Sequence, residues 1–111
     1  MHIDKDPIEP QLLAALEADE ELKARARARD AALAVTDRRV LVAANERLAL
    51  SVPFEELRRI QFDIERSRPA TMVIVPEQRH DEPQVLAIDP EEYDSAAQAL
   101  ALIGRRLAAI S

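Results

Sequence analysis

Several residue types that build functional sites are missing from this sequence of 111 residues, or are scarce in it. There is no cysteine, and glycine occurs once. The lack of cysteine excludes disulfides, thiolate catalysis and cysteine-based zinc sites, and it fits a reducing cytoplasm. A single glycine excludes a glycine-rich loop that would hold a phosphate group. We therefore expect no cofactor and no retained metal ion.

Long apolar runs and a net positive charge are also absent. No apolar run approaches the roughly 20 residues that cross a bilayer, and the acidic N-terminus lacks the apolar core of a signal peptide. The formal net charge of -6 repels nucleic acids and anionic lipids unless a local basic patch overcomes it. Lysine occurs only at Lys5 and Lys23 while Arg and Ala are plentiful, which indicates a GC-rich, bacterial genome. We expect a cytoplasmic protein that does not bind nucleic acid.

Apolar residues make up 48% of the chain, which is enough for the core of one domain. Residues 8–18 are predicted to form a short helix with one apolar face. We divide the chain into an acidic segment with that helix, residues 1–19, and a folded domain, residues 20–111. The residues of the apolar face are Ile8, Leu12, Leu13 and Leu16.

Residues 23–30, KARARARD, carry a positive charge at every second position. Propensity favours a helix, because Ala and Arg are strong helix formers. Periodicity favours a strand, because a step of two turns about 200° around a helix and would scatter the charges. In a strand the charged residues share one face and the alanines share the other. We predict a strand whose basic face comprises Lys23, Arg25, Arg27 and Arg29.

Apolar runs separated by turn residues predict further strands downstream. The alternation is clearest in residues 59–65, where Ile60, Phe62 and Ile64 share one face. A turn is expected at residues 45–47, since asparagine tolerates a left-handed backbone. The other predicted strands are 32–36, 40–44, 48–52, 71–75 and 84–88. The residues expected on one face of the strand 48–52 are Leu48, Leu50 and Val52.

A closing helix is predicted to begin after Asp89, with Pro90 in its first turn. Asp89 and Glu92 have the spacing of a capping box, in which each side chain binds the other residue's backbone. The single glycine, Gly104, lies beside the apolar stripe of this helix, so we expect a close approach of helix to sheet there. The stripe should cover the open end of a small barrel. Its residues are Tyr93, Ala97, Leu100, Ile103, Leu107 and Ile110.

The segments ALAVTDRRVLVA and SVPFEELRRI resemble the bacterial pleckstrin-homology-like (PH-like) family, which is related to GRAM domains. The order of expected elements agrees with that family over residues 20–110. The resemblance implies a mainly β fold: a split barrel of about seven antiparallel strands in two sheets, capped by a C-terminal amphipathic helix. It implies no catalytic residues, because the family binds and scaffolds. The matching residues are Val35, Thr36, Asp37, Arg39, Val52, Pro53, Phe54, Glu55 and Leu57.

The segment TDRR, residues 36–39, is typical of a tight hairpin, because Thr36 and Asp37 can accept hydrogen bonds from backbone groups two residues on. A purely structural turn is one interpretation. The other is that Arg38 and Arg39 belong to a recognition surface at the end of a strand.

Catalytic and metal sites find little support. The serines lack the setting of a nucleophile, and the carboxylates occur in surface runs rather than in a facing pair. His80 and Asp81, in the loop 76–83, are too few ligands to retain a metal. We expect no enzymatic activity.

The basic strand allows two interpretations. Four basic residues near an anionic membrane contribute about 4 kcal/mol, which corresponds only to millimolar affinity. Alternatively, they form a solvated outer face that pairs with acids such as Asp63 and Glu65, or that meets an acidic face of a neighbouring subunit. The leading hypothesis is a binding or scaffold module that acts through protein–protein interaction and self-associates. The alternative is peripheral binding to anionic lipid head groups through the basic strand, from Lys23 to Arg29. The candidate surface for a partner or an anionic ligand comprises Lys23, Arg25, Arg27, Arg29, Arg38 and Arg39.

Overall fold

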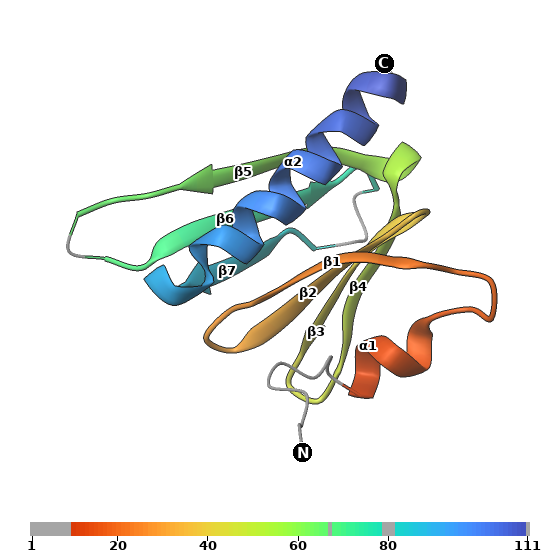
Figure 1. Ribbon diagram of the computed structural model, residues 1–111, viewed down its shortest axis with the longest axis horizontal. Coiled ribbons are helices and arrows are strands. Elements are labelled where there is room, and N and C mark those ends of the chain that lie inside the picture. Colours follow the sequence, from red (N-terminus) through yellow and green to blue (C-terminus); the bar gives the residue numbers. More distant parts are fainter. Residues whose placement is uncertain (1–9, 67, 79–81, 111) are drawn as a thin grey trace.

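A computed structural model of the protein describes residues 10–66, 68–78 and 82–110. The strands form two antiparallel sheets, in the orders β1-β2-β3-β4 and β5-β6-β7. In the view of Figure 1, helix α2 crosses the three-stranded sheet, and it packs against β1 of one sheet and β5 of the other. This confirms the predicted fold class, including the short helix that precedes the first strand. The elements are α1 (Pro10–Ala15), β1 (Leu22–Arg27), β2 (Ala31–Thr36), β3 (Arg39–Ala44), β4 (Arg47–Pro53), η1 (Phe54–Glu56), β5 (Leu57–Asp63), β6 (Ala70–Pro76), β7 (Gln84–Ile88), η2 (Pro90–Glu92) and α2 (Tyr93–Ile110).

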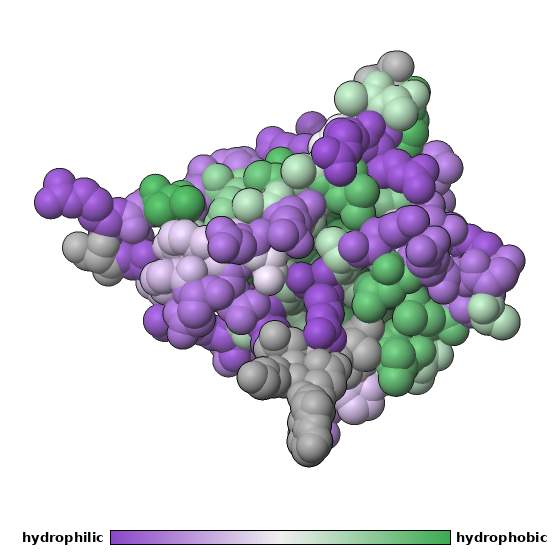
Figure 2. Space-filling view, in the orientation of Figure 1, coloured by the Kyte–Doolittle hydropathy of each residue, from purple (hydrophilic) through white to green (hydrophobic). Residues whose placement is uncertain are grey.

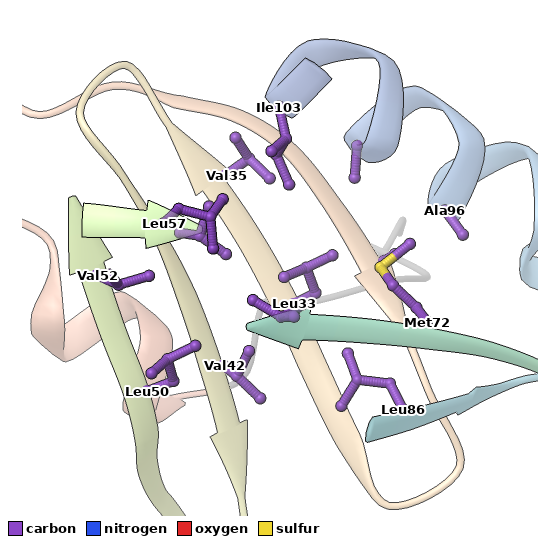
Figure 3. Packing of buried hydrophobic residues seen from close by; sticks show 14 of the residues in the cluster. Leu33, Val35, Val42, Leu50, Val52, Leu57, Met72, Leu86, Ala96 and Ile103 are labelled. Carbon is purple, nitrogen blue, oxygen red and sulfur yellow. The ribbon is translucent and has the colours of Figure 1, made fainter. Parts of the chain in front are cut away.

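The main core lies between the two sheets and α2 (Figure 3). It forms because every second residue of each strand is apolar and faces inward. The three aromatic residues take the core positions expected for them: Phe54 is buried, and the rings of Phe62 and Tyr93 meet edge to face with centroids 6.0 Å apart. Burial of this apolar surface is the main stabilising contribution to the fold.

A second, smaller core lies on the outer face of the four-stranded sheet. There Leu12 of α1 is fully buried against apolar residues of β2 and β3. The predicted helix 8–18 is shorter than expected, because it ends at Ala15; residues 8 and 9 lie outside the described part of the chain. The sheet residues under α1 are Ala32, Ala34, Leu41 and Ala43.

The turn expected at residues 45–47 is confirmed, and a bulge beside it changes the register. Asn45 and Glu46 have φ values of 54° and 61°, the left-handed conformation that suits a two-residue hairpin turn. The register then shifts between Val42 and Ala43, so that Leu48 lies opposite Ala43 on the outer face. The prediction that Leu48 shares a face with Leu50 was therefore wrong, because an extra residue in one strand reverses the alternation.

The apolar face of α2 agrees with the expected stripe in part: Tyr93, Leu100, Ile103 and Leu107 belong to or pack against the main core. Ala96, Ala99 and Ile103 are its buried residues, whereas Ala97 and Ile110 are exposed. The predicted close approach at Gly104 was wrong, since a Cβ placed there would meet no atom within 4 Å. Small alanines, not the glycine, form the buried centre of the helix.

Strand β5 likewise differs from its prediction in where it ends. It begins at Leu57 and stops at Asp63, so Ile64 lies beyond the ladder and is 60% exposed. Ile60 and Phe62 do pack against the main core, as the alternation predicted.

Candidate functional site

The basic strand is confirmed, and its alanines face the core. Ala26 is buried, and Ala24 and Ala28 pack against the main core. Arg25 and Arg27 lie opposite Ala34 and Ala32, which places them on the outer face of the sheet. This alternation separates a basic face from an apolar face, as the period of two in the sequence indicates.

The two ends of the basic stripe depart from the regular strand. Lys23 sits in a β-bulge, where the register shifts between Leu22 and Ala24, and its Nζ lies 3.0 Å from an Oε1 of Glu21. Arg29 lies past the end of β1, in the turn to β2. The stripe is therefore a continuous basic face only at Arg25 and Arg27.

The end of β1 is bound to the start of the closing helix. The Nε of Arg29 donates a hydrogen bond to Asp89 Oδ1 at 2.9 Å, and its backbone N–H donates to the carbonyl of Ala87 at 2.9 Å. The backbone N–H of Arg27 donates to Glu92 Oε1 at 3.2 Å. These contacts join the edge of the first sheet to the last strand of the second.

The same contacts explain why the predicted capping box was wrong. Asp89 does precede the first turn, but its side chain makes no cap hydrogen bond. The first turn, Pro90–Glu92, is a 3₁₀ turn, in which the N–H of Glu92 donates to the backbone carbonyl of Asp89. Glu92 instead binds the end of β1, and Asp89 binds Arg29 in the turn after it; a local sequence motif cannot show such partners.

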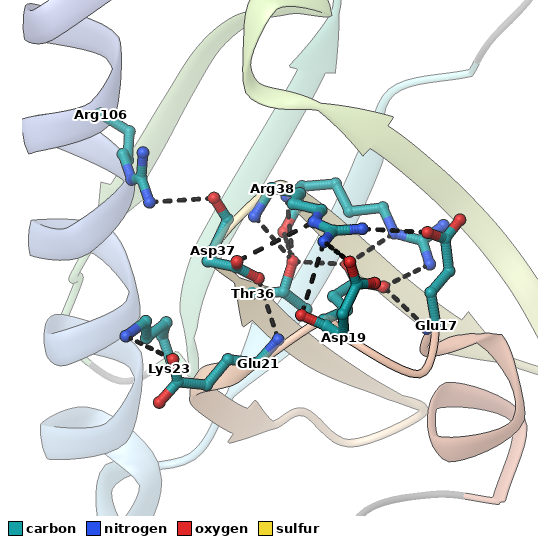
Figure 4. A network of polar contacts seen from close by, with 10 residues as sticks. Glu17, Asp19, Glu21, Lys23, Thr36, Asp37, Arg38 and Arg106 are labelled. Carbon is teal, nitrogen blue, oxygen red and sulfur yellow. Dashed lines mark hydrogen bonds and ion pairs between the residues drawn. The ribbon is translucent and has the colours of Figure 1, made fainter.

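The TDRR turn is organised by one buried hydroxyl (Figure 4). Thr36 Oγ1 accepts hydrogen bonds from the N–H groups of Arg38 at 3.0 Å and Arg39 at 3.1 Å. It donates to Glu20 Oε2 at 2.7 Å. Asp37 instead accepts from the N–H of Glu21 at 2.9 Å. The expected role of Thr36 in turn formation is thus confirmed, and Asp37 ties the turn to the chain before β1.

Arg39 forms a two-pronged ion pair with Glu20. Its Nε and Nη2 donate to the two carboxylate oxygens at 2.8 and 2.7 Å, the geometry that makes such pairs strong. Its remaining donors reach the carbonyl of Ala15 and the hydroxyl of Ser51. The Glu20 side chain is fully buried. The hydrogen bonds from Arg39 lower the pKa of Glu20 to about 2, although burial opposes the shift.

Arg38 makes a more exposed set of ion pairs. Its guanidinium lies 3.0 Å from Glu17 Oε1 and 2.8 Å from Asp19 Oδ2. The hydrogen bond from Arg38 lowers the pKa of Asp19. Both arginines of the turn are therefore bound by the acidic segment that leads into β1, so an external anion would have to compete with these internal carboxylates.

Arg106 is a contributor that the sequence pattern does not reveal. Its Nη2 donates to the carbonyl of Asp37 at 2.9 Å, and its guanidinium lies 5.3 Å from the centre of the Phe54 ring. It thus fastens α2 both to the TDRR turn and to η1. A position near the end of a helix predicts only an interaction with the helix dipole.

The six predicted site residues do not converge on one ligand site. Arg38 and Arg39 belong to the TDRR turn, Lys23 lies near it, and Arg25 lies in the middle of β1. Arg27 and Arg29 lie at the opposite end of β1, roughly 15 Å away along the strand, where they line an open hollow of about 250 Å³ together with the acids Asp30 and Glu46. Both groups are mixed with carboxylates, so neither is a purely basic patch.

The acids that were expected to pair with the basic strand, Asp63 and Glu65, have other partners. Asp63 Oδ2 accepts a hydrogen bond from Gln61 Nε2 at 2.8 Å, and Glu65 Oε1 lies 3.7 Å from Arg68 Nε. The residues considered as metal ligands in the sequence, His80 and Asp81, lie outside the described part of the chain, as does His2.

Among residues 10–66, 68–78 and 82–110, no group of His, Cys, Asp and Glu could hold a metal ion. No helix in the same ranges combines the length and the apolarity needed to cross a membrane.

Comparison with solved structures decides the fold. A pleckstrin homology domain from Shewanella amazonensis SB2B superposes with a TM-score of 0.61 and 17% sequence identity, over 86% of this chain and 82% of that chain. The chain has a PH-like fold. No family model matches the sequence, and no curated protein matches it. The PH-like fold thus rests on architecture: the VTDRR turn joins β2 to β3, and VPFEEL forms the corner between β4 and β5.

Proposed function

We propose that this PH-like chain is a non-enzymatic binding module that works through protein–protein contact and associates with itself. The observation that carries this proposal is that the three-stranded sheet has an unpaired edge at β5 and apolar residues that are exposed or partly exposed on its outer face. Its partner sheet has an outer face covered by α1. On the three-stranded sheet, α2 packs on the core side, and Val85 of β7, on the opposite face, is 68% exposed.

The outer face of this sheet is apolar at its centre. Val73 lies opposite both Gln61 and Val85, and these residues point away from Met72 and Leu86, which belong to the core. Val75, on the same face, is only partly buried. Contiguous apolar surface of this kind is typical of a contact surface. A sheet that is open at an edge and apolar on a face is commonly completed by another protein chain.

The test is the mass of the purified chain in solution. Multi-angle light scattering and sedimentation velocity should show a dimer or larger species whose fraction rises from micromolar to near-millimolar concentration. A monomer throughout this range would refute self-association. Enzymatic catalysis by the chain would require a cleft that holds carboxylates with shifted pKa values. The lowered pKa values of Asp19 and Glu20 are instead explained by their ion pairs with Arg38 and Arg39.

Peripheral binding to anionic lipid is the alternative, and the observation in its favour is the hollow lined by Arg27 and Arg29. Against it stand the ion pair of Arg29 with Asp89 and the net charge of -6. Vesicles of phosphatidylserine and phosphatidylcholine at low salt would sediment the chain if this alternative held. That binding should weaken when Arg25→Glu and Arg27→Glu are combined, and its absence at low salt would exclude the alternative.

A further inference from the structure

Strand β5 is an open edge of the three-stranded sheet. It pairs with β6 on one side only. Alternate N–H and C=O groups of an edge strand point outward and can template another strand. Within the described part of the chain, residues 58–63 make no backbone hydrogen bond other than those to β6. The edge therefore has unused pairing capacity.

Two charges in the regular part of β5, those of Arg59 and Asp63, are self-complementary; the third, that of Arg58, lies in the irregularity between Leu57 and Arg59. Arg59, Gln61 and Asp63 lie on the outer face and are exposed. The charges have opposite sign and are equally far from Gln61. If an identical strand ran antiparallel with the two Gln61 residues opposed, each Arg59 would face an Asp63 of the other strand. On the core side, Ile60 would face Phe62. Pairs of both kinds stabilise antiparallel strands.

The other edge strands lack this property. Strand β1 carries Lys23, Arg25 and Arg27, whose like charges would repel in an antiparallel self-pair. The carbonyl of Ala87 on β7 already accepts a hydrogen bond from Arg29. Strand β4 carries a single charge, at Arg47, and ends in proline. Charge complementarity thus selects β5 and a second copy of the same strand.

We propose that two copies of this chain associate by antiparallel pairing of their β5 strands, about a two-fold axis at Gln61, into one continuous sheet. This deepens the proposed function and rests on its self-association. The half-buried side chains of Ile60 and Phe62 gain cover across the axis, and each copy contributes the same surface, as a two-fold interface requires.

A cysteine at the axis tests the geometry directly, because the natural chain has none. Opposed residues in antiparallel strands have Cα atoms about 4.5–5.5 Å apart, which is within the range that a disulfide spans. Gln61→Cys should therefore form a covalent dimer under mild oxidation at micromolar concentration. Val85→Cys, exposed on the same face but at the far edge, is the matched control and should stay monomeric on a denaturing gel.

A charge exchange tests the partners of the pair. Arg59→Asp and Asp63→Arg should each weaken self-association about tenfold or more, because each change creates two like-charge contacts per dimer. An equimolar mixture of the two variants should recover dimers, since each repulsive pair becomes attractive in the mixed dimer. Circular dichroism of each variant confirms that the fold is retained.

The outcomes separate this inference from the proposed function. A wild-type dimer that is unaffected by both charge variants, with no Gln61→Cys cross-link, overturns β5 pairing and leaves self-association intact. Cross-linking of Val85→Cys in place of Gln61→Cys also overturns it, and points to contact between the outer faces. A wild-type chain that remains monomeric overturns both proposals.

Discussion

The buried pair between Glu20 and Arg39 should make the stability of this protein depend on pH in a defined window. Glu20 has an ordinary pKa of 4.5 and a pKa of about 2 in the folded chain, chiefly because Arg39 donates hydrogen bonds to its carboxylate. A difference of about 2.5 pKa units corresponds to about 3 kcal/mol at neutral pH. Because the folded-state pKa is the lower one, this stabilisation is present above pH 4.5 and is lost as the pH falls toward 2.

The variant Glu20→Gln isolates this contribution. Urea unfolding at pH 7 should give a free energy of unfolding about 3 kcal/mol below that of the natural chain. The difference should shrink toward zero as the pH approaches 2, where Glu20 is itself protonated. Glu17→Gln is the control: it removes a mostly exposed partner of Arg38 and should change stability little. An equal loss at pH 7 and pH 2, or no loss at either, would refute the role assigned to this pair.

Two further substitutions test the packing. Gly104→Ala should raise the free energy of unfolding by about 1 kcal/mol, because alanine favours the helix and its Cβ would meet no neighbour; an unchanged or lower thermal midpoint would show that the glycine has a role in the folded chain. Leu12→Ala should lower the free energy of unfolding by about 2–4 kcal/mol, since this side chain of α1 is fully buried against β2 and β3. If Leu12→Ala lowered only the stability of α1 and left the unfolding of the domain unchanged, residues 1–19 would contribute little to the stability of the fold.

The sequence predicted the strands well because their signal is local and repeated. The alternation in KARARARD outweighed the helical propensity of Ala and Arg, and Ala26 does face the core. The spacing of Asp89 and Glu92 predicted a capping box that does not form, because carboxylates bind whichever donors the fold brings near. Here those donors belong to Arg27 and Arg29, about 60 residues earlier in the chain.

The site residues were harder to predict for the same reason. The basic character of Arg38 and Arg39 was plain in the sequence, but their partners were not. Glu17, Asp19 and Glu20 come from a segment that is apart from the hairpin in sequence and lies beside it only once β1 has paired with β2. The acidic run before β1 and the two arginines after β2 are thus complementary parts of one structural unit.

The edge strands show how the same charge chemistry can have opposite consequences. A strand with charges of one sign, such as β1, disfavours pairing with its own copy, which is a common protection against aggregation. A strand with opposite charges placed symmetrically about one residue, as Arg59 and Asp63 of β5 are about Gln61, favours an antiparallel copy in the register that opposes them. A shift by one residue would oppose the outer face of one strand to the inner face of the other. The basic residues of β1 therefore disfavour self-pairing at one edge of the module, whereas β5 is the edge that we propose to pair.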